Sequence, residues 1–373
     1  MPSTLNYIEY GAFRNCYSIK TINYKTSELI DLESWDAIFL SDKPFSNQIT
    51  VNIDENVTAI ADYVFNDLPA SQLNYCAKNL ISYGENSFDD FGSSEGLNVI
   101  INDSVLTLPN SFLCKNDKIK EVTIGKNVSS IGGGAFCDCL NISKITYNAI
   151  DCQNNNLFAI GSIYSANNDV EVVIGDEVKS LTNIRFGMLG RHIISLTLGK
   201  SLNVIGDWVL ENCVFDTLYI PANVTFISEN AFYGGTFDVN SIIVDENNKI
   251  YTSKDFSGNN INAIVNKSNK QMILFTQNLV IPRDGSVLST NNMSFVHFDS
   301  DKYVIIPKTI VFVETFVVSS SEKVPVFLEF EELPWWAKNI YNAEIYIYSE
   351  TLLSNNEQKY WHYDENNLPI INT

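Results

Sequence analysis

Apolar residues recur along the chain at fixed offsets. Between residues 122 and 147 they follow the frame V-x-I-x3-V-x2-I-x3-A-F-x2-C-x2-I-x2-I, and the frame then starts again. The V-x-I segments begin at residues 99, 122, 145, 172, 196, 218 and 242, so successive copies are 22–27 residues apart. Weaker copies lie at 51–65 and 80–88. This regularity predicts an array of structural repeats.

Each repeat predicts a short strand followed by two changes of direction. The alternation in V-x-I places two side chains on one face of a strand and the middle one on the other. The V-x2-I step indicates a second extended stretch, and the Ala-Phe pair with a Cys three residues later predicts one tight helical turn. One coil cannot bury its apolar side chains alone, so coils stack at about 4.8 Å per strand. We therefore expect a mainly β fold with short helical turns, a solenoid of about a dozen coils.

The first copy of the frame is incomplete. Ile8, Ala12, Phe13 and Cys16 fit it, but no V-x-I segment precedes them, so we expect the chain to begin in mid-repeat with an open first coil. The first residues have neither the basic region nor the apolar core of a signal peptide. No apolar run approaches the roughly 18 residues of a membrane span.

Two segments resemble the BspA-like leucine-rich repeat proteins, whose repeats read VTIPxSVTSIGxxAFxxCxxLxxITI. They are 122–147 and 218–244, and the second begins LYIPANVTFISENAFYGG. A hairpin insertion in that family begins VDENNxxYxSxDG, and residues 244–255 read VDENNKIYTSKD. The resemblance covers about residues 5–320. It implies a right-handed leucine-rich-repeat solenoid, a place at the cell surface or outside the cell, and a role in adhesion.

The frame also predicts how the chain is divided. Residues 1–325 belong to the solenoid, with the hairpin insertion at about 245–278. Residues 326–373 are rich in aromatic side chains. We expect them to form a C-terminal repeat or cap element, because the last coil otherwise exposes its core and an open strand edge.

The charge balance excludes one class of partner. The chain has 24 Lys and Arg against 44 Asp and Glu, a formal net charge of −20. A polyanion repels phosphate backbones, so we expect no nucleic-acid partner. The hydrophobic fraction of 45% indicates a chain that buries a large core.

The cysteines are expected to be structural. Seven cysteines are an odd number without framework spacing, which predicts reduced, buried thiols rather than disulfides. Cys16, Cys139 and Cys213 occupy the same position of the frame, which makes them core spacers. Cys137 and Cys139 have no second pair at the spacing of a zinc site.

No catalytic constellation follows from the sequence. His192, His297 and His362 fall in different coils, whereas catalytic groups must converge in space. Residues 132–134 are glycines without the Lys-Ser/Thr of a phosphate loop, so they are expected to relax a tight corner.

Carboxylates are concentrated in the predicted turns. Asp54–Glu55, Asp89–Asp90 and Asp245–Glu246 are adjacent pairs of this kind. Two carboxylates across a cleft can hydrolyse a glycoside, and acidic turns can hold calcium. We expect these acids to form a solvated rim and to hold no cofactor. Calcium stays open as an ion that these turns could bind.

The middle residues of V-x-I form the predicted binding face. They are Asn52, Thr123, Thr146, Thr197, Tyr219 and Ile243. A long face of this kind suits recognition of a protein or glycan over a wide area. The sequence therefore predicts a non-enzymatic protein-interaction or adhesion module.

Trp335, Trp336 and Trp361 lie near the C-terminus. If exposed, they form an aromatic contact patch. The alternative, which we expect for most of the aromatic residues there, is packing within the cap.

Two other functions stay open. A structural assembly subunit, for example of a virion or surface layer, would dock or self-associate through the open N-terminal coil. A polysaccharide hydrolase would use the acid pairs and the C-terminal aromatics.

Overall fold

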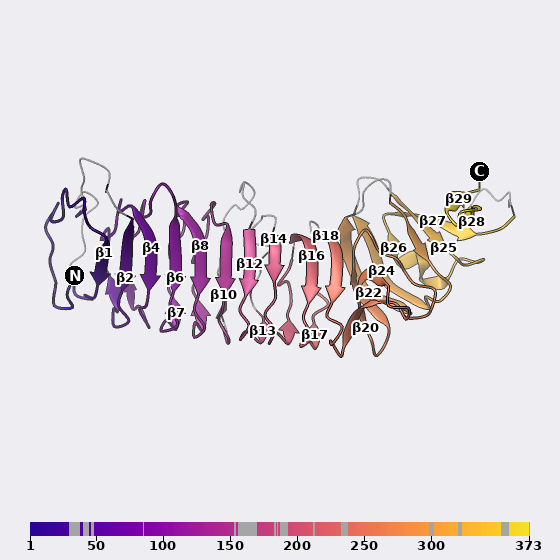
Figure 1. The fold of residues 1–373 in the computed structure, drawn as a ribbon. Helices are drawn as coiled ribbons and strands as arrows, with labels where there is room; N and C mark the ends of the chain where they lie inside the picture. The colour runs from indigo at the N-terminus through magenta and orange to yellow at the C-terminus, as the bar shows by residue number, and fades with distance from the viewer. Residues whose placement is uncertain are drawn as a thin grey trace. The chain divides into compact units, whose positions relative to one another are not determined.

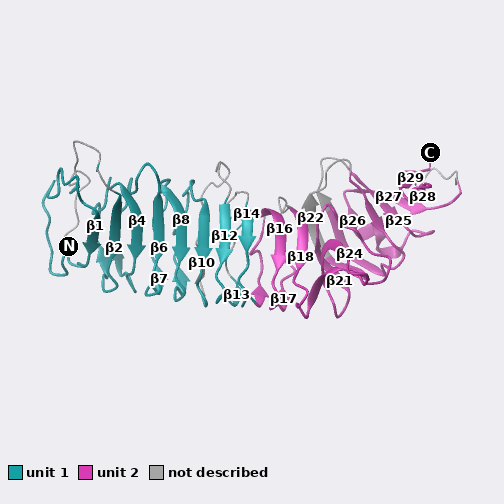
Figure 2. Cartoon of the chain, in the orientation of Figure 1, with its two compact units in different colours: residues 1–202 teal, residues 203–373 magenta. Residues whose placement is uncertain are grey.

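A computed structural model shows a chain built of strands joined by turns (Figure 1). It divides into two compact units, residues 1–202 and 203–373 (Figure 2). The structure describes residues 1–29, 38–39, 45, 48–84, 86–152, 154–155, 170–182, 184, 186, 193–211, 213–232, 238–297, 302–319, 323–351 and 358–372.

Unit 1 is a β-solenoid whose main wall is an eight-stranded parallel sheet. Each coil contributes one strand, and strands from successive coils are neighbours in the sheet (Figure 1). The strands are β1 (Thr21–Tyr24), β2 (Ile49–Ile53), β4 (Ala70–Tyr75), β6 (Leu97–Ile101), β8 (Ile119–Ile124), β10 (Lys144–Tyr147), β12 (Val170–Ile174) and β14 (Ile193–Thr197). The solenoid architecture is confirmed, and its right-handed sense remains a prediction.

The register of this sheet follows the predicted repeat. Val122 of β8 lies beside Val99 of β6 and Ile145 of β10. Val172 of β12 in turn lies between Ile145 and Leu196 of β14. All five side chains are buried. Equivalent residues of successive copies are therefore nearest neighbours, as the V-x-I frame predicts.

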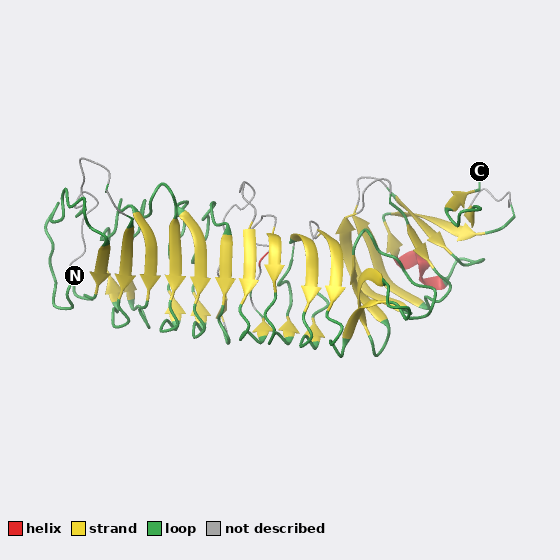
Figure 3. Ribbon diagram, viewed as in Figure 1, coloured by secondary structure: helices red, strands yellow, loops and turns green. Residues whose placement is uncertain are grey.

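The V-x2-I segments form a second row of two-residue strands (Figure 3). Strands β7, β9 and β11 pair in parallel, as do β3 and β5. Their bounds, with β13, are β3 (Ala59–Ile60), β5 (Ser82–Tyr83), β7 (Thr107–Leu108), β9 (Ser130–Ile131), β11 (Asn154–Asn155) and β13 (Ser180–Leu181). Ile60, Leu108 and Ile131 are buried, so this row gives the coils a second core-facing side.

The Ala-Phe segment at residues 134–138 forms a single hydrogen-bonded turn that does not continue into a helix, and Phe186, at the same position of another copy, has 3-10 conformation. The Cys137 N–H donates to the Gly134 carbonyl at 3.1 Å. Gly134 and Asp138 have left-handed φ angles of 68° and 54°. A left-handed residue cannot continue a right-handed helix. No α-helix occurs anywhere in the described ranges.

Aromatic rings pack from coil to coil inside unit 1. The Phe112 centroid lies 5.9 Å from that of Phe136, 6.2 Å from that of Phe88 and 4.8 Å from that of Tyr75. These rings are buried, so the Ala-Phe position supplies a column of aromatic contacts. Tyr75 belongs to β4, a strand that the sequence frame misses.

The cysteine position of the frame does more than space the core. Cys139 is buried, and its thiol donates to the Leu113 carbonyl at 3.1 Å. Asn116 takes the same place one coil earlier. Its amide donates to the Phe91 carbonyl at 2.7 Å and its side-chain oxygen accepts the Lys118 N–H at 2.9 Å. The position thus links a coil to the one before it.

The expectation of reduced thiols is wrong for two cysteines. Cys114 and Cys137 form a disulfide, with their Cα atoms 4.7 Å apart. Their sequence separation of 23 is one repeat, so stacking places them side by side in adjacent coils. The free cysteines of the described chain are Cys16, Cys76, Cys139, Cys152 and Cys213.

The outer edge of β1 is partly covered, which differs from the open first coil expected. The Met1 amino group donates to the Asn23 carbonyl at 2.8 Å, and the Lys25 N–H donates to the Met1 carbonyl at 3.1 Å. The Thr26 hydroxyl also donates to the Leu5 carbonyl at 2.5 Å. The first residues therefore lie along the strand on the side away from β2.

Unit 2 begins with parallel strands and continues with an antiparallel insertion. Strands β16 and β18 pair in parallel, as do β15 and β17. Strands β19, β20 and β21 pair antiparallel within the segment where the hairpin insertion was expected. The bounds are β15 (Val204–Ile205), β16 (Val214–Ile220), β17 (Phe226–Ile227), β18 (Asp238–Val244), β19 (Tyr251–Lys254), β20 (Asn260–Asn266) and β21 (Gln271–Phe275).

Two sheets complete unit 2. One is ordered β19-β20-β21-β22-β24-β26, and the other β23-β25-β27-β28-β29. The boundary predicted between residues 325 and 326 falls inside β25, in the second sheet. The remaining elements are β22 (Ser289–His297), β23 (Val304–Ile306), β24 (Phe312–Ser319), β25 (Val324–Leu328), the 3-10 helix η2 (Trp335–Asn339), β26 (Ile340–Tyr341), β27 (Ala343–Tyr348), β28 (Lys359–Tyr363) and β29 (Pro369–Ile371).

Close stacking predicts opposite outcomes at two adjacent glycines. A Cβ on Gly132 would lie 2.4 Å from the backbone nitrogen of Asn110, whereas one on Gly133 would meet nothing nearer than 3.9 Å. Gly132→Ala should cost about 1–3 kcal/mol of unfolding free energy. Gly133→Ala should be neutral or stabilising by up to about 1 kcal/mol. Urea unfolding followed by circular dichroism measures both, and equal effects would contradict the role given to Gly132.

The donor role of Asn116 predicts a second effect. Asn116→Ala leaves the Phe91 carbonyl and the Lys118 N–H without these partners in a buried site. We expect a loss of about 1–3 kcal/mol in unfolding free energy. Asn116→Cys, which copies the chemistry of Cys139, should lose less. The same urea unfolding assay compares the two losses of unfolding free energy. Equal losses for Asn116→Ala and Asn116→Cys would contradict this role of the side chain.

Candidate binding surface

Four predicted face residues lie in one row on the outside of the unit 1 sheet. Asn52, Thr123, Thr146 and Thr197 are the middle residues of their strands, and all are partly or fully exposed. Thr146 is directly beside Thr123. The complete row, in sheet order, is Asn23, Asn52, Asn74, Ile100, Thr123, Thr146, Val173 and Thr197.

The first three members of the row form an asparagine ladder. The Asn52 amide donates to the Asn23 side-chain oxygen at 2.8 Å, and the Asn74 amide donates to the Asn52 oxygen at 2.7 Å. The Gln72 amide adds a bond to Asn74 at 2.7 Å. Each bond fixes the side chains before any partner arrives. Sequence reasoning found only Asn52, although the shared segment pattern T-I-N-Y, V-N-I and L-N-Y was the available signal.

The neighbouring row carries the charges of the sheet face. Lys144 of β10 lies between Glu121 of β8 and Glu171 of β12, and its amine is 3.1 Å from the Glu171 carboxylate. These side chains are partly exposed, so the pair adds little stability. The alternation of sign brings opposite charges together along the row.

The other two predicted face residues lie in unit 2. Tyr219 of β16 is directly opposite Ile243 of β18, and each is 42% exposed. The Tyr219 hydroxyl donates to the Asp245 carboxylate. The ring is thus outward-facing and tethered at its far end.

The predicted aromatic patch is wrong for two of its three members. Trp336 is 2% exposed and Trp361 is fully buried, with its indole N–H donating to the Leu328 carbonyl at 2.9 Å. Trp335 is 67% exposed and stacks on Phe312 with centroids 5.5 Å apart. Trp336 and Trp361 instead pack within the C-terminal element, as expected for most of the aromatic residues there.

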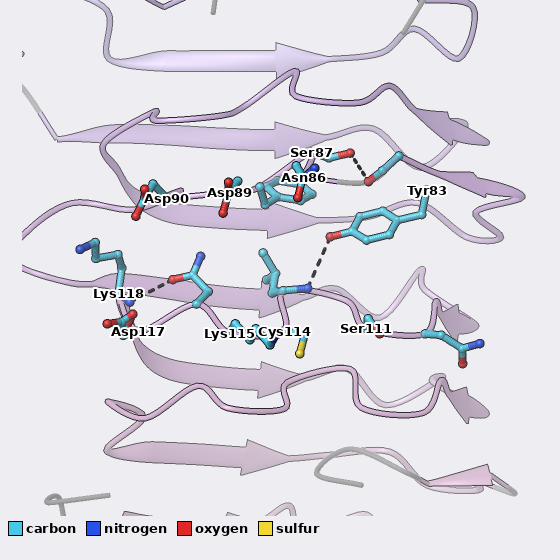
Figure 4. Close-up of a pocket in the computed structure, with 15 residues that line it drawn as sticks. Tyr83, Asn86, Ser87, Asp89, Asp90, Ser111, Cys114, Lys115, Asp117 and Lys118 are labelled. Atoms are coloured by element: carbon cyan, nitrogen blue, oxygen red, sulfur yellow. Dashed lines mark hydrogen bonds between the residues drawn. The ribbon is translucent and has the colours of Figure 1, made fainter. Parts of the chain in front are cut away.

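A groove of about 600 Å³ opens at the turn edge of unit 1 (Figure 4). Its walls come from two successive coils and carry Asn86, Asp89, Asp90, Ser111, Lys115 and Lys118. The Tyr83 hydroxyl accepts the Leu113 N–H at 3.4 Å, and burial raises the pKa of Tyr83. Because the walls carry both Asp89 and Asp90 as well as Lys115 and Lys118, the groove has mixed charge.

The acidic turns satisfy their carboxylates with donors of the protein. The Asp54 carboxylate accepts the Asn56 N–H at 3.2 Å, and this bond holds the pKa of Asp54 below its usual range, with help from Lys25. The Lys200 amine lies 2.8 Å from Asp176, and its hydrogen bond lowers the pKa of that carboxyl. No group of three His, Cys, Asp or Glu side chains placed to hold a metal was found in the part of the chain that the structure describes. Nor does that part contain a helix long and apolar enough to cross a membrane.

The tether between Tyr219 and Asp245 predicts a pH effect. The Tyr219 hydrogen bond is the largest cause that lowers the pKa of Asp245, followed by the Asn247 N–H. Because the folded pKa is depressed, the stability that Asp245 contributes is present above the unfolded value of about 3.9 and is lost as pH falls through the folded value. In Tyr219→Phe the pKa of Asp245 should rise but stay below about 3.9. Carbon-13 titration of the carboxyl measures this, and an unchanged value would disprove the tether.

A comparison with protein families agrees with the repeat geometry. A family model described as the BspA type leucine rich repeat region matches in six copies, over residues 1–36, 39–162 and 160–278. A leucine-rich repeat protein from Eubacterium ventriosum is similar at 16% identity and a TM-score of 0.36, over 63% of this chain and 68% of that one. A leucine rich cell surface protein from Faecalibacterium prausnitzii is similar at 15% identity and a TM-score of 0.28, over 88% of this chain and 92% of that one. No curated protein matches. With the family model covering well over half of its residues, this chain belongs to the BspA-type leucine-rich repeat proteins.

Proposed function

We propose that the protein is a non-enzymatic adhesion module whose outward sheet face engages a protein or glycan partner. The asparagine ladder of Asn23, Asn52 and Asn74 carries this proposal, because its side chains are already held by one another. A surface ordered in advance loses little conformational entropy when a partner binds. Membership of the BspA-type family supports the same role.

The place of action we propose is the cell surface or the extracellular space. The Cys114–Cys137 disulfide supports it, because disulfides persist mainly in oxidising compartments. The net charge of −20 argues against nucleic acid as the partner.

The assembly-subunit alternative has less support. It relied on an open N-terminal coil, and the Met1 segment occupies part of the β1 edge. The hydrolase alternative needs two carboxylates that face each other across a cleft. Asp89 and Asp90 line the groove with Lys115 and Lys118, but the two acids are adjacent in the chain, so we assign them no catalytic role.

An obstruction on the sheet face tests the proposed function. The full chain is first screened on protein and glycan arrays. The affinity of each captured partner is then measured for the unmodified chain and for two variants. Thr146→Arg places a long side chain in the middle of the outward row, so binding should fall at least about tenfold, the loss that removal of a central interface contact produces. Thr58→Arg is the matched control, because Thr58 is exposed beside β3 rather than on the sheet.

The two variants should unfold at the same temperature as the unmodified chain. Equal binding by Thr146→Arg and Thr58→Arg would show that the sheet face of unit 1 is not the contact. Failure of the unmodified chain to bind any array member would count against the adhesion module itself.

A further inference from the structure

The outward surface of β16 and β18 differs in chemistry from the sheet face of unit 1. Its aromatic and aliphatic members, Tyr219 and Ile243, lie directly opposite each other. Beside them Thr217 lies opposite Ser241, which adds a pair of hydroxyl groups. All four side chains are partly or fully exposed. A ring and polar groups thus occupy adjacent positions on two paired strands.

The ring of Tyr219 is held in position from one end. Its hydroxyl is bonded to Asp245, which follows β18 on the neighbouring coil. The Asp245 carboxylate is itself held, because it accepts the Asn247 N–H at 2.8 Å. This arrangement leaves the ring face available while its hydroxyl is occupied, as a stacking platform requires.

Directional hydrogen-bonding groups lie further along the same two strands, three residues before Tyr219 and Ile243. The Asn240 amide donates to the Asp216 carboxylate at 2.9 Å, and both residues are exposed. That bond uses one of the two N–H groups of the amide and part of the acceptor capacity of the carboxylate. The Asn278 amide donates to the Asn240 carbonyl at 3.1 Å, which ties the neighbouring segment to the same place.

We propose that this surface binds a neutral polysaccharide, with the Tyr219 ring against the C–H face of a sugar and Asp216 and Asn240 bonding its hydroxyls. The inference rests on the proposed function and names the ligand class for this part of the surface. Sugars present an apolar C–H face and a rim of hydroxyls, which match an exposed ring beside a carboxylate and an amide.

Charge and composition favour this ligand over two others. Asp245 and Glu246 place negative charge near the ring, and Asp216 adds a carboxylate further along β16, so sulfated or uronic-acid chains are repelled. Protein interfaces have an apolar centre that is poor in charge. Of the outward residues beside Tyr219 and before it on the two strands, Asp216, Thr217, Asn240 and Ser241 are polar. The aliphatic residues are Ile243 and, at the start of β16, the partly exposed Val214.

The test is titration calorimetry of the full chain with soluble linear β-1,4-linked gluco-, xylo- and manno-oligosaccharides. Oligogalacturonate serves as the acidic probe. We expect at least one neutral probe to bind and the acidic probe to bind more weakly. Tyr219→Ala should weaken that binding at least about tenfold. Tyr219→Phe keeps the ring but releases it from Asp245, so the loss should be about threefold.

Tyr341→Ala is the matched control, because Tyr341 is a 52% exposed tyrosine elsewhere in unit 2. It should leave the affinity unchanged, and thermal unfolding of each variant checks that the fold is kept. Asn240→Ala should lose about fivefold through its hydrogen bonds.

Three results would overturn the inference: no neutral probe binds, the acidic probe binds as well as the neutral ones, or Tyr219→Ala retains full affinity. Capture of a protein partner that depends on Tyr219, without any neutral sugar, would also overturn it while leaving the adhesion module intact. A chain that binds neither sugars nor proteins would remove both proposals, so the two failures are distinguishable.

Discussion

In-register stacking of the coils is the constraint on which the rest of unit 1 depends. Val99, Val122, Ile145 and Val172 are bonded neighbours through their strands, so each position of the repeat becomes a column. A column places a residue against its own equivalents about 4.8 Å away. Every position must therefore be compatible with copies of itself. This requirement explains the columns of aromatic rings and hydrogen-bond donors better than the needs of any single coil.

The same rule operates on the outside of the sheet. Like charges in one column would repel, and the column of Glu121, Lys144 and Glu171 alternates in sign. Asparagine suits a column because its amide carries both donor and acceptor, and Asn23, Asn52 and Asn74 use both. Acidic residues of the described turns, such as Asp54 and Asp176, are bound by backbone N–H groups and by lysines.

This architecture separates stability from recognition. The inward columns bury the core, and several outward residues of the same strands are bonded to one another, as in the asparagine ladder. Unit 1 presents amides, hydroxyls and paired charges, whereas β16 and β18 of unit 2 present a tethered ring with an aliphatic neighbour. Outward residues can change without altering the core, which is how one scaffold serves different partners.

The sequence by itself determined the repeat, the inward and outward positions, and the register. These follow from a local rule, since the side chain of a strand residue faces the core or the solvent according to its place in a period of two. Tyr219 and Ile243 were placed outward on that basis, and Cys139 and Cys213 were placed inside. The frame did not contain β4, whose inward positions include Leu73 and Tyr75, or the strands between residues 289 and 371.

Only the tertiary structure decided which residues of different coils are in contact, because the repeat pattern describes each coil by itself. Cys114 and Cys137 are partners because stacking aligns residues one repeat apart, although neither stands in the cysteine position of the frame. Trp335 and Trp336 are adjacent in sequence, yet one is exposed and the other is buried, because the 3-10 helix points them to different sides. Periodicity fixes which side of a strand a residue takes, while the neighbouring coil, which supplies the partner, exists only once the chain has folded.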